Sequence, residues 1–203
     1  MNLTSNAISK TGRTILTASF PVGETCRKNA PCYKKCYGRK GTMRYPAYLK
    51  SMEENLKVYK TNPEFYYQHI HMELQLIPYR YFRWFVTGDM PDEAFFEKVA
   101  VRLAFRHPQT KFLMFTKKFE YVNAFLESGH TIPSNLNVVF SAWGNFMPEN
   151  PYNLPVSYVR FSEKDKETNE YIPSDARECS GKCYNCMDCW HLKHGESVVF
   201  NRH

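Results

Sequence analysis

The chain has 203 residues, of which 43% are hydrophobic and 16% aromatic, and its formal net charge is +7. This composition predicts a single folded domain over residues 1–203 and excludes a disordered chain. No apolar run approaches the roughly 18 residues of a membrane span, and residues 1–10 lack the apolar core of a signal peptide. We therefore expect a cytoplasmic protein with no membrane partner.

The positive charge favours an anionic partner, such as nucleic acid or an acidic protein. Two explanations stay open for the basic residues that gather around the first cysteines: they contact nucleic acid, or they offset the negative charge of thiolates. These residues are Arg27, Lys28, Lys34, Lys35, Arg39, Lys40 and Arg44.

The first third of the chain contains one strand-like run and two helical patterns. Residues 14–18 are rich in β formers and lead into a loop that carries three cysteines. Pro46 opens a stretch with apolar residues at spacings of three and four, and residues 63–77 repeat that pattern before Pro78. We expect a strand, the cysteine loop and two helices in that order.

Strand-like and helical patterns then alternate. Further strands are expected at Tyr81–Val86, Lys111–Phe115, Leu136–Phe140 and Val156–Phe161, and helices at Pro91–His107 and Phe119–Ser128. Such alternation predicts an α/β fold with a mainly parallel sheet. We expect a partial, open β/α barrel of about five or six strands over residues 1–162, followed by a cysteine-rich C-terminal extension, 163–203.

Polar residues follow the expected strands, where α/β folds place their chemistry. The second strand runs into Thr87, Gly88 and Asp89, the third is followed by Lys117, and Ser141 follows the fourth. Each has a structural alternative, since Asp89 could cap a helix and Ser141 could simply end a strand.

Three cysteines, Cys26, Cys32 and Cys36, lie within eleven residues after the first expected strand. Thiolates at this spacing can converge from one loop, and soft sulfur ligands select iron-sulfur clusters or zinc. A structural zinc site takes four protein ligands, whereas a four-iron cluster held by three cysteines leaves one iron free. Buried apolar cysteine is the alternative.

The C-terminal part carries a second group, Cys179, Cys183, Cys186 and Cys189. Four cysteines in eleven residues favour an iron-sulfur cluster, with zinc as the alternative, because four-cysteine zinc sites commonly separate two Cys-x2-Cys pairs by a dozen or more residues. One open [4Fe-4S] cluster and one fully ligated site would use all seven cysteines.

The order of these features resembles one known family. The first cysteine loop through Tyr37, the segment 83–89, the residues 115–117 and the end with Cys189 and Trp190 are similar to the "gene product 88" family of phage and plasmid proteins. This resemblance covers nearly the whole chain. It implies an iron-sulfur protein from a mobile element, located in the cytoplasm of the host cell.

The chain also resembles radical S-adenosylmethionine enzymes, which use a partial β/α barrel and a three-cysteine cluster loop after the first strand. The resemblance implies that Cys26, Cys32 and Cys36 hold a [4Fe-4S] cluster whose free iron binds S-adenosylmethionine. It further implies that Thr87, Gly88 and Asp89 receive the methionyl amine, and that Lys117 or Ser141 contacts the carboxylate or ribose. The cysteines here are separated by five and then three residues, where that superfamily usually has three and then two.

Two functional hypotheses follow. The first is a compact radical S-adenosylmethionine enzyme supplied by an electron donor, with a second cysteine-bound metal site at the C-terminus. The second is a non-catalytic iron-sulfur or zinc scaffold that binds nucleic acid or a host protein through its basic and aromatic surface.

Overall fold

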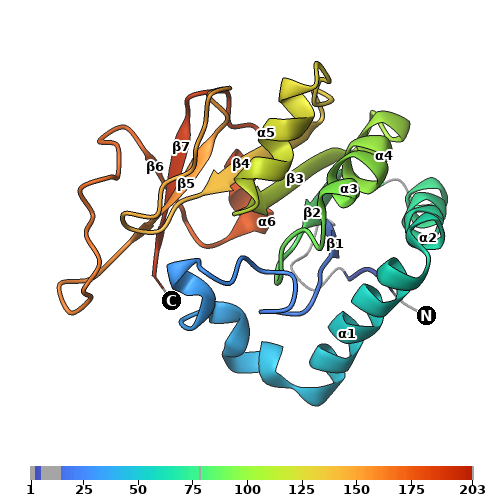
Figure 1. Ribbon diagram of the computed structural model, residues 1–203, viewed down its shortest axis with the longest axis horizontal. Coiled ribbons are helices and arrows are strands. Elements are labelled where there is room, and N and C mark those ends of the chain that lie inside the picture. Colours follow the sequence, from blue (N-terminus) through green and yellow to red (C-terminus); the bar gives the residue numbers. More distant parts are fainter. Residues whose placement is uncertain (1–2, 6–14, 78, 203) are drawn as a thin grey trace.

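The computed structural model describes residues 3–5, 15–77 and 79–202. Within them, seven parallel strands form one open sheet in the order β1-β2-β3-β4-β5-β7-β6 (Figure 1). The strands are β1 (Ile15–Ala18), β2 (Tyr81–Trp84), β3 (Lys111–Thr116), β4 (Leu136–Ser141), β5 (Val156–Arg160), β6 (Arg177–Glu178) and β7 (Ser197–Asn201). The chain is thus an open α/β protein, as the alternating pattern predicts.

The helices connect successive strands. They are α1 (Pro46–Thr61), α2 (Pro63–Leu76), α3 (Glu93–Phe95), the π-helical η4 (Phe96–Val101), α4 (Arg102–Arg106), α5 (Phe119–Glu127) and α6 (Cys183–Cys186). The described residues also form four 3-10 turns: η1 (Pro31–Tyr33), η2 (Tyr37–Arg39), η3 (Gly41–Arg44) and η5 (Asp188–Trp190). No helix in the described part of the chain is both long enough and apolar enough to cross a membrane.

Side-chain caps fix two helix starts. The Asn62 side chain accepts a hydrogen bond from the Phe65 amide at the start of α2, and Asp92 accepts one from the Phe95 amide at the start of α3. Such caps satisfy amides that have no partner within the helix. Because Asp92 is the cap, α3 begins two residues later than the expected start at Pro91.

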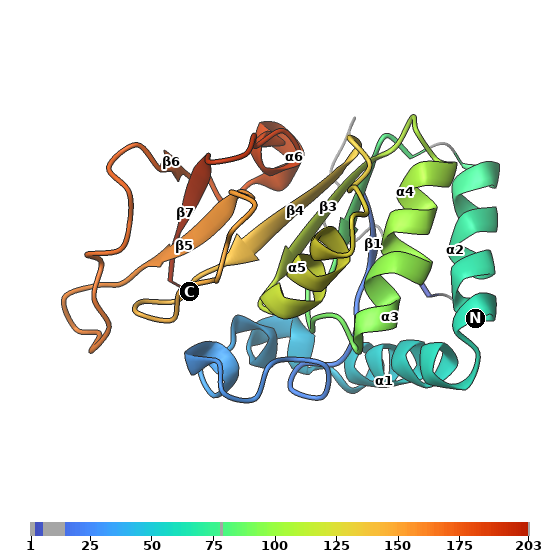
Figure 2. The same cartoon turned by 45° about the horizontal axis from the view of Figure 1, so that its top comes forward.

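The two faces of the sheet are covered differently. The outer face, which carries Phe82, Trp84 and Phe112, packs against α1 to α5 in the main hydrophobic core. The inner face, which carries Ile15, Leu113 and Val139, is covered by residues 187–192 of the C-terminal segment. Figure 2 shows α5 and α6 on opposite sides of the sheet.

The C-terminal segment is part of the sheet. Five strands appear where the pattern predicts them, except that Thr14 lies outside the described residues, but residues 163–203 add β6 and β7. Strand β7 pairs with β5 along five residues. The expected extension after residue 162 therefore completes the sheet and covers its inner face.

The carboxyl ends of β1 to β4 meet at one edge of the sheet. The strand arrows point toward the segment with η1 and η2, which crosses below them (Figure 2). This edge brings the first cysteine loop next to the residues that follow β2, β3 and β4, as expected for a parallel sheet.

Candidate functional site

The first cysteine loop leaves β1 and folds as a series of tight turns. Cys26 lies in an irregular segment, Cys32 lies in η1, and Cys36 is the N-cap of η2. Backbone amides face two of the sulfurs: the Gly23 amide is 3.4 Å from Cys26 Sγ and the Gly38 amide is 3.4 Å from Cys36 Sγ. Amide donors of this kind stabilise thiolates and tune the metals that thiolates bind.

The three thiols of this loop are close enough to affect one another. Burial, together with negative charge on Asp89, Cys36 and Cys32, raises the pKa of Cys26 to about 11, although the hydrogen bond from the Gly23 amide opposes the rise. Burial also raises the pKa of Cys32, while the ammonium group of Lys117 opposes that rise. Burial therefore favours the protonated form of Cys26 and Cys32, and a metal that binds such thiols must displace their protons.

The segment after β2 makes a tight backbone turn against the exit of β1. Gly88 has φ +78°, and a Cβ atom there would lie 2.6 Å from the Phe20 carbonyl oxygen. The Thr87 hydroxyl donates to that same carbonyl at 3.1 Å and lies 2.7 Å from the Tyr48 hydroxyl. Only glycine fits this close backbone approach.

Asp89 is 5% exposed, and its carboxylate is enclosed by donors. It accepts hydrogen bonds from the Thr116 hydroxyl at 2.7 Å, the Lys117 amide at 2.8 Å and the Met90 amide at 2.8 Å. Burial raises its pKa, and these donors oppose the rise. The Asp89 side chain, which follows β2, is thus hydrogen-bonded to the end of β3.

Lys117 and Ser141 extend the same edge to β4. The Lys117 ammonium group donates to the Ser141 hydroxyl at 2.6 Å. The Lys117 charge also opposes the rise in the pKa of Cys32 and of Asp89, so the ammonium group lies near both of them. Hydrogen bonds thus link three residues that strand order predicts one by one: Asp89, Lys117 and Ser141.

The second cysteine group lies on the inner face of the sheet. Cys183 and Cys186 stand three residues apart on α6, a spacing that places side chains on one helix face. Cys179 directly follows β6, and its sulfur faces the Gly181 amide at 3.3 Å. Burial, together with negative charge on Cys179, Cys183 and Cys186, raises the pKa of Cys189 to about 12.

Trp190 anchors this group to the strands. Its side chain is 4% exposed, its indole N–H donates to the Phe82 carbonyl at 3.0 Å, and its ring meets the Tyr81 ring edge-on at 5.6 Å. The side-chain amide of Asn137 donates to the Cys189 carbonyl at 2.7 Å. Strands β2 and β4 therefore hold the turn that carries Cys189.

Arg83 and Tyr37 belong to this region, although neither was singled out as a site residue from the sequence. The Arg83 guanidinium reaches Cys183, and the Tyr37 hydroxyl donates to the Val86 carbonyl beyond β2. A signal for Arg83 was present, since it is a charged residue at an inner position of the strand Tyr81–Trp84, which is otherwise aromatic. Tyr37 carries no comparable signal.

All seven cysteines are free thiols. Among the residues that the structure describes, no three or more His, Cys, Asp or Glu side chains are grouped so as to hold a metal ion.

Five of the seven basic residues around the first cysteines can be sorted by their ion pairs. Arg27 pairs with Glu120 of α5, and Lys35 pairs with Glu167 at 2.7 Å. Lys28, Lys34 and Arg44 are exposed and have no ion-pair partner among the described residues.

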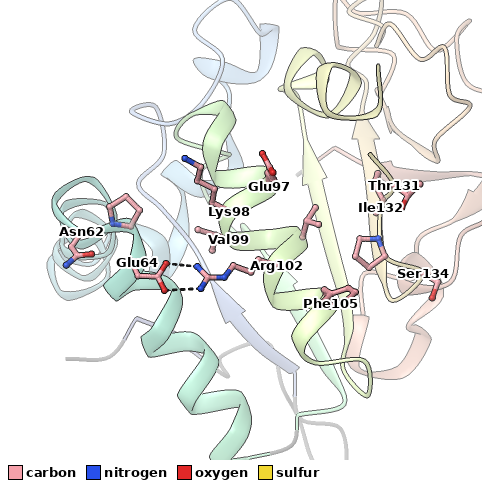
Figure 3. A pocket seen from close by; sticks show the side chains of 13 residues that line it. Asn62, Glu64, Glu97, Lys98, Val99, Arg102, Phe105, Thr131, Ile132 and Ser134 are labelled. Atoms are coloured by element: carbon pink, nitrogen blue, oxygen red, sulfur yellow. Dashed lines mark hydrogen bonds and ion pairs between the residues drawn. The ribbon is translucent and has the colours of Figure 1, made fainter. Parts of the chain in front are cut away.

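A cavity of about 900 Å³ opens elsewhere, between α2, η4, α4 and residues 131–134 (Figure 3). Arg102 forms two hydrogen bonds with Glu64 at its wall. None of the seven cysteines lines this cavity, and neither do Thr87, Gly88, Asp89, Lys117 and Ser141.

The fold and the cysteines together define an open-sheet α/β protein with one group of free thiols past the carboxyl edge and another on the inner face. The family model described as "Gene product 88" matches residues 2–197, and the chain belongs to this family. No curated protein and no solved structure matches the chain.

Proposed function

We propose that the chain is an iron-sulfur protein that works as a compact radical S-adenosylmethionine enzyme. In this proposal Cys26, Cys32 and Cys36 hold an open [4Fe-4S] cluster, and the four C-terminal cysteines hold a second metal site. One observation carries it: three thiols on a single loop follow the first strand, and two of them, Cys26 and Cys32, lie near Asp89 at the carboxyl edge, with Lys117 near Cys32.

The donors in the first loop suit such a cluster. Sulfur ligands on short turns can rotate toward a common point, and amides already face Cys26 and Cys36. When bound, an open cluster supplies an electron for reductive cleavage of S-adenosylmethionine. Lys117 and Ser141 would bind the carboxylate or ribose of S-adenosylmethionine. The turn at Gly88 would present backbone groups to the methionyl amine of the same molecule.

To test this proposal, the protein is purified without oxygen and its iron, sulfide and zinc contents are measured. The reduced protein is then examined by electron paramagnetic resonance. About four irons per chain or more, with a spectrum that changes when S-adenosylmethionine is added, would support the enzyme. Iron without that change would indicate a scaffold or an electron carrier. Zinc without iron would contradict the proposal and leave both cysteine groups structural.

The Cys32→Ala variant tests the two-site arrangement. We expect it to lose the iron of the first loop while keeping the metal of the C-terminal cysteines, because the two groups lie on different parts of the sheet. Cys186→Ala is the matched control and should show the reverse pattern. Unchanged iron per chain in Cys32→Ala would contradict two separate sites.

A second candidate function is a non-catalytic scaffold that binds nucleic acid. The favouring observation is that Tyr45, 62% exposed, follows Arg44, and that Lys28, Lys34 and Arg44 are unpaired among the described residues. Aromatic rings beside basic groups can stack on unpaired bases. This function would appear as salt-dependent binding of single-stranded nucleic acid without cleavage of S-adenosylmethionine.

Paired substitutions test this alternative. Binding should weaken in Tyr45→Ala and Arg44→Ala, whereas Lys50→Ala, at an exposed position on α1, should bind like the parent. Equal binding by all three variants would argue against this surface.

A further inference from the structure

Arg83 occupies an unusual position on the inner face of the sheet. In the register of the strands it stands between Thr17 of β1 and Leu113 of β3, while its neighbours Phe82 and Trp84 point into the outer core. A charged side chain on a central strand needs partners, because burying an unpaired charge is costly.

Its partners come from the inner face and the C-terminal segment. Arg83 Nη1 lies 3.8 Å from Cys183 Sγ, and the guanidinium carbon lies 5.2 Å from the centre of the Phe115 ring. Its Nε is enclosed and has no hydrogen-bond partner among the residues that the structure describes. Arg83 is therefore held between an aromatic ring and a cysteine sulfur, with one donor still available.

Three of the C-terminal cysteines gather at this point of the inner face. Cys179, Cys183 and Cys189 pack, with Phe115, against the same apolar cluster. Because Arg83 contacts both Phe115 and Cys183, it lies beside this cysteine group.

We propose that Arg83 is the positioning residue of the C-terminal metal site, where it donates to Cys183 and offsets the negative charge of the thiolates. This inference rests on the metal proposed for those cysteines. Arginine suits the role better than lysine, because its planar guanidinium can stack on Phe115 while its N–H groups face the sulfur. Groups of this kind orient metal ligands and tune the bound metal.

The test compares Arg83→Gln and Arg83→Lys with Arg80→Gln. Arg80 is a matched control because it is an exposed arginine beside the same strand, with its guanidinium 5.6 Å from the Tyr81 ring. Each chain also carries Cys32→Ala, so that the retained metal reports the C-terminal site alone. The readouts are metal per chain after anaerobic purification, its rate of release to EDTA and, where the metal is iron, the midpoint potential.

We expect Arg83→Gln to weaken metal retention by about 10- to 100-fold, the usual effect of losing such a partner. A bound cluster should also become harder to reduce, because a positive charge near it is gone. Metal retention in Arg83→Lys should lie between that of Arg83→Gln and that of the parent, because lysine keeps the charge and loses the planar donors. Arg80→Gln should match the parent.

Retention and potential equal to the parent in Arg83→Gln would overturn the role of Arg83. If Arg83→Gln does not fold, Arg83→Lys provides the test. Metal release from Arg83→Lys at the parental rate would then overturn the role of Arg83. A Cys32→Ala parent without metal would reject the C-terminal site and Arg83's role together, while iron in the wild-type chain would still support the first cluster. These results therefore separate a failure of this inference from a failure of the proposed function.

Discussion

The backbone at Gly88 comes so close to the exit of β1 that a side chain does not fit between them. Gly88→Ala would place an L residue at φ +78° with its Cβ 2.6 Å from the Phe20 carbonyl oxygen. We expect a loss of about 2 to 4 kcal/mol in the free energy of unfolding, combining left-handed strain with overpacking. Urea unfolding measures it.

Gly129→Ala is the matched control for this prediction. Gly129 has φ +86°, but a Cβ there would have no atom within 4 Å. Gly129→Ala should lower the free energy of unfolding by about 1 to 2 kcal/mol, from conformational strain alone. Equal losses in the two variants would show that the contact with Phe20 adds nothing.

At the residue scale, the sequence predicts which polar residues lie at the carboxyl edge of the sheet but not the hydrogen bonds that they form. Parallel strands bring their carboxyl ends together, so Asp89, Lys117 and Ser141 could be assigned to one edge from strand order alone. The hydrogen bonds to the Asp89 carboxylate and the position of Arg83 beside Cys183 depend on packing across the sheet. Local sequence patterns carry no such information.

At the element scale, Trp190 joins the C-terminal turns to β2. Trp190→Phe keeps an aromatic ring but removes the donor to the Phe82 carbonyl, and we expect a loss of about 1 to 3 kcal/mol in the free energy of unfolding. Retention of the metal that we propose for the C-terminal cysteines should also fall, because Cys189 precedes Trp190 in the same turn. Urea unfolding and metal counts measure both effects.

Trp84→Phe serves as the comparison. Trp84 is fully buried on the outer face, and its indole N–H has no hydrogen-bond partner within the described part of the chain. This variant should lose packing but leave C-terminal metal retention unchanged. Equal loss of metal in both variants would mean that general destabilisation, not the anchor at Trp190, controls retention.

The junction of α2 and α4 should respond to acid. His107 Nε2 lies 2.8 Å from His71 Nδ1, and burial, with the charge of His71, lowers the pKa of His107. A depressed histidine pKa means that the unfolded chain binds the proton more readily. Its contribution to stability is therefore present above the unfolded pKa of about 6.5 and is lost as pH falls through the folded value.

We expect His107→Gln to reduce the loss of stability on acidification below about pH 6.5, because the replacement does not titrate. Urea unfolding at a series of pH values measures this. His194→Gln, at an exposed position that contacts the Tyr152 carbonyl, is the control and should follow the parent. The same acid dependence in His107→Gln and the parent would contradict the prediction.

At the scale of the whole molecule, the sequence indicates the sheet but not its completion. The five expected strands have several β formers each, whereas β6 has two residues and β7 follows a polar, cysteine-rich stretch. Residues 163–203 were therefore expected to be an extension, yet β7 pairs with β5 and residues 187–192 cover the inner face. Such pairing depends on long-range contacts, which strand propensity does not encode.

This arrangement predicts that residues 1–162 do not fold cooperatively alone. Without the C-terminal segment, the apolar inner face with Ile15, Leu113 and Val139 would lose its cover from Trp190 and Val198. A large exposed apolar surface promotes association. We expect the truncated chain to aggregate or to unfold without a sharp urea transition, as size-exclusion chromatography and urea unfolding would show.

Co-expression of 1–162 with 163–203 provides the control for truncation. The two pieces should associate and recover a cooperative transition, because the break falls just after β5, in an irregular segment between β5 and β6. A monomeric 1–162 chain with a sharp transition would instead mean that the five-stranded unit is stable by itself. The C-terminal cysteines would then be carried on a separable layer, and Arg83 would face solvent in the shorter chain.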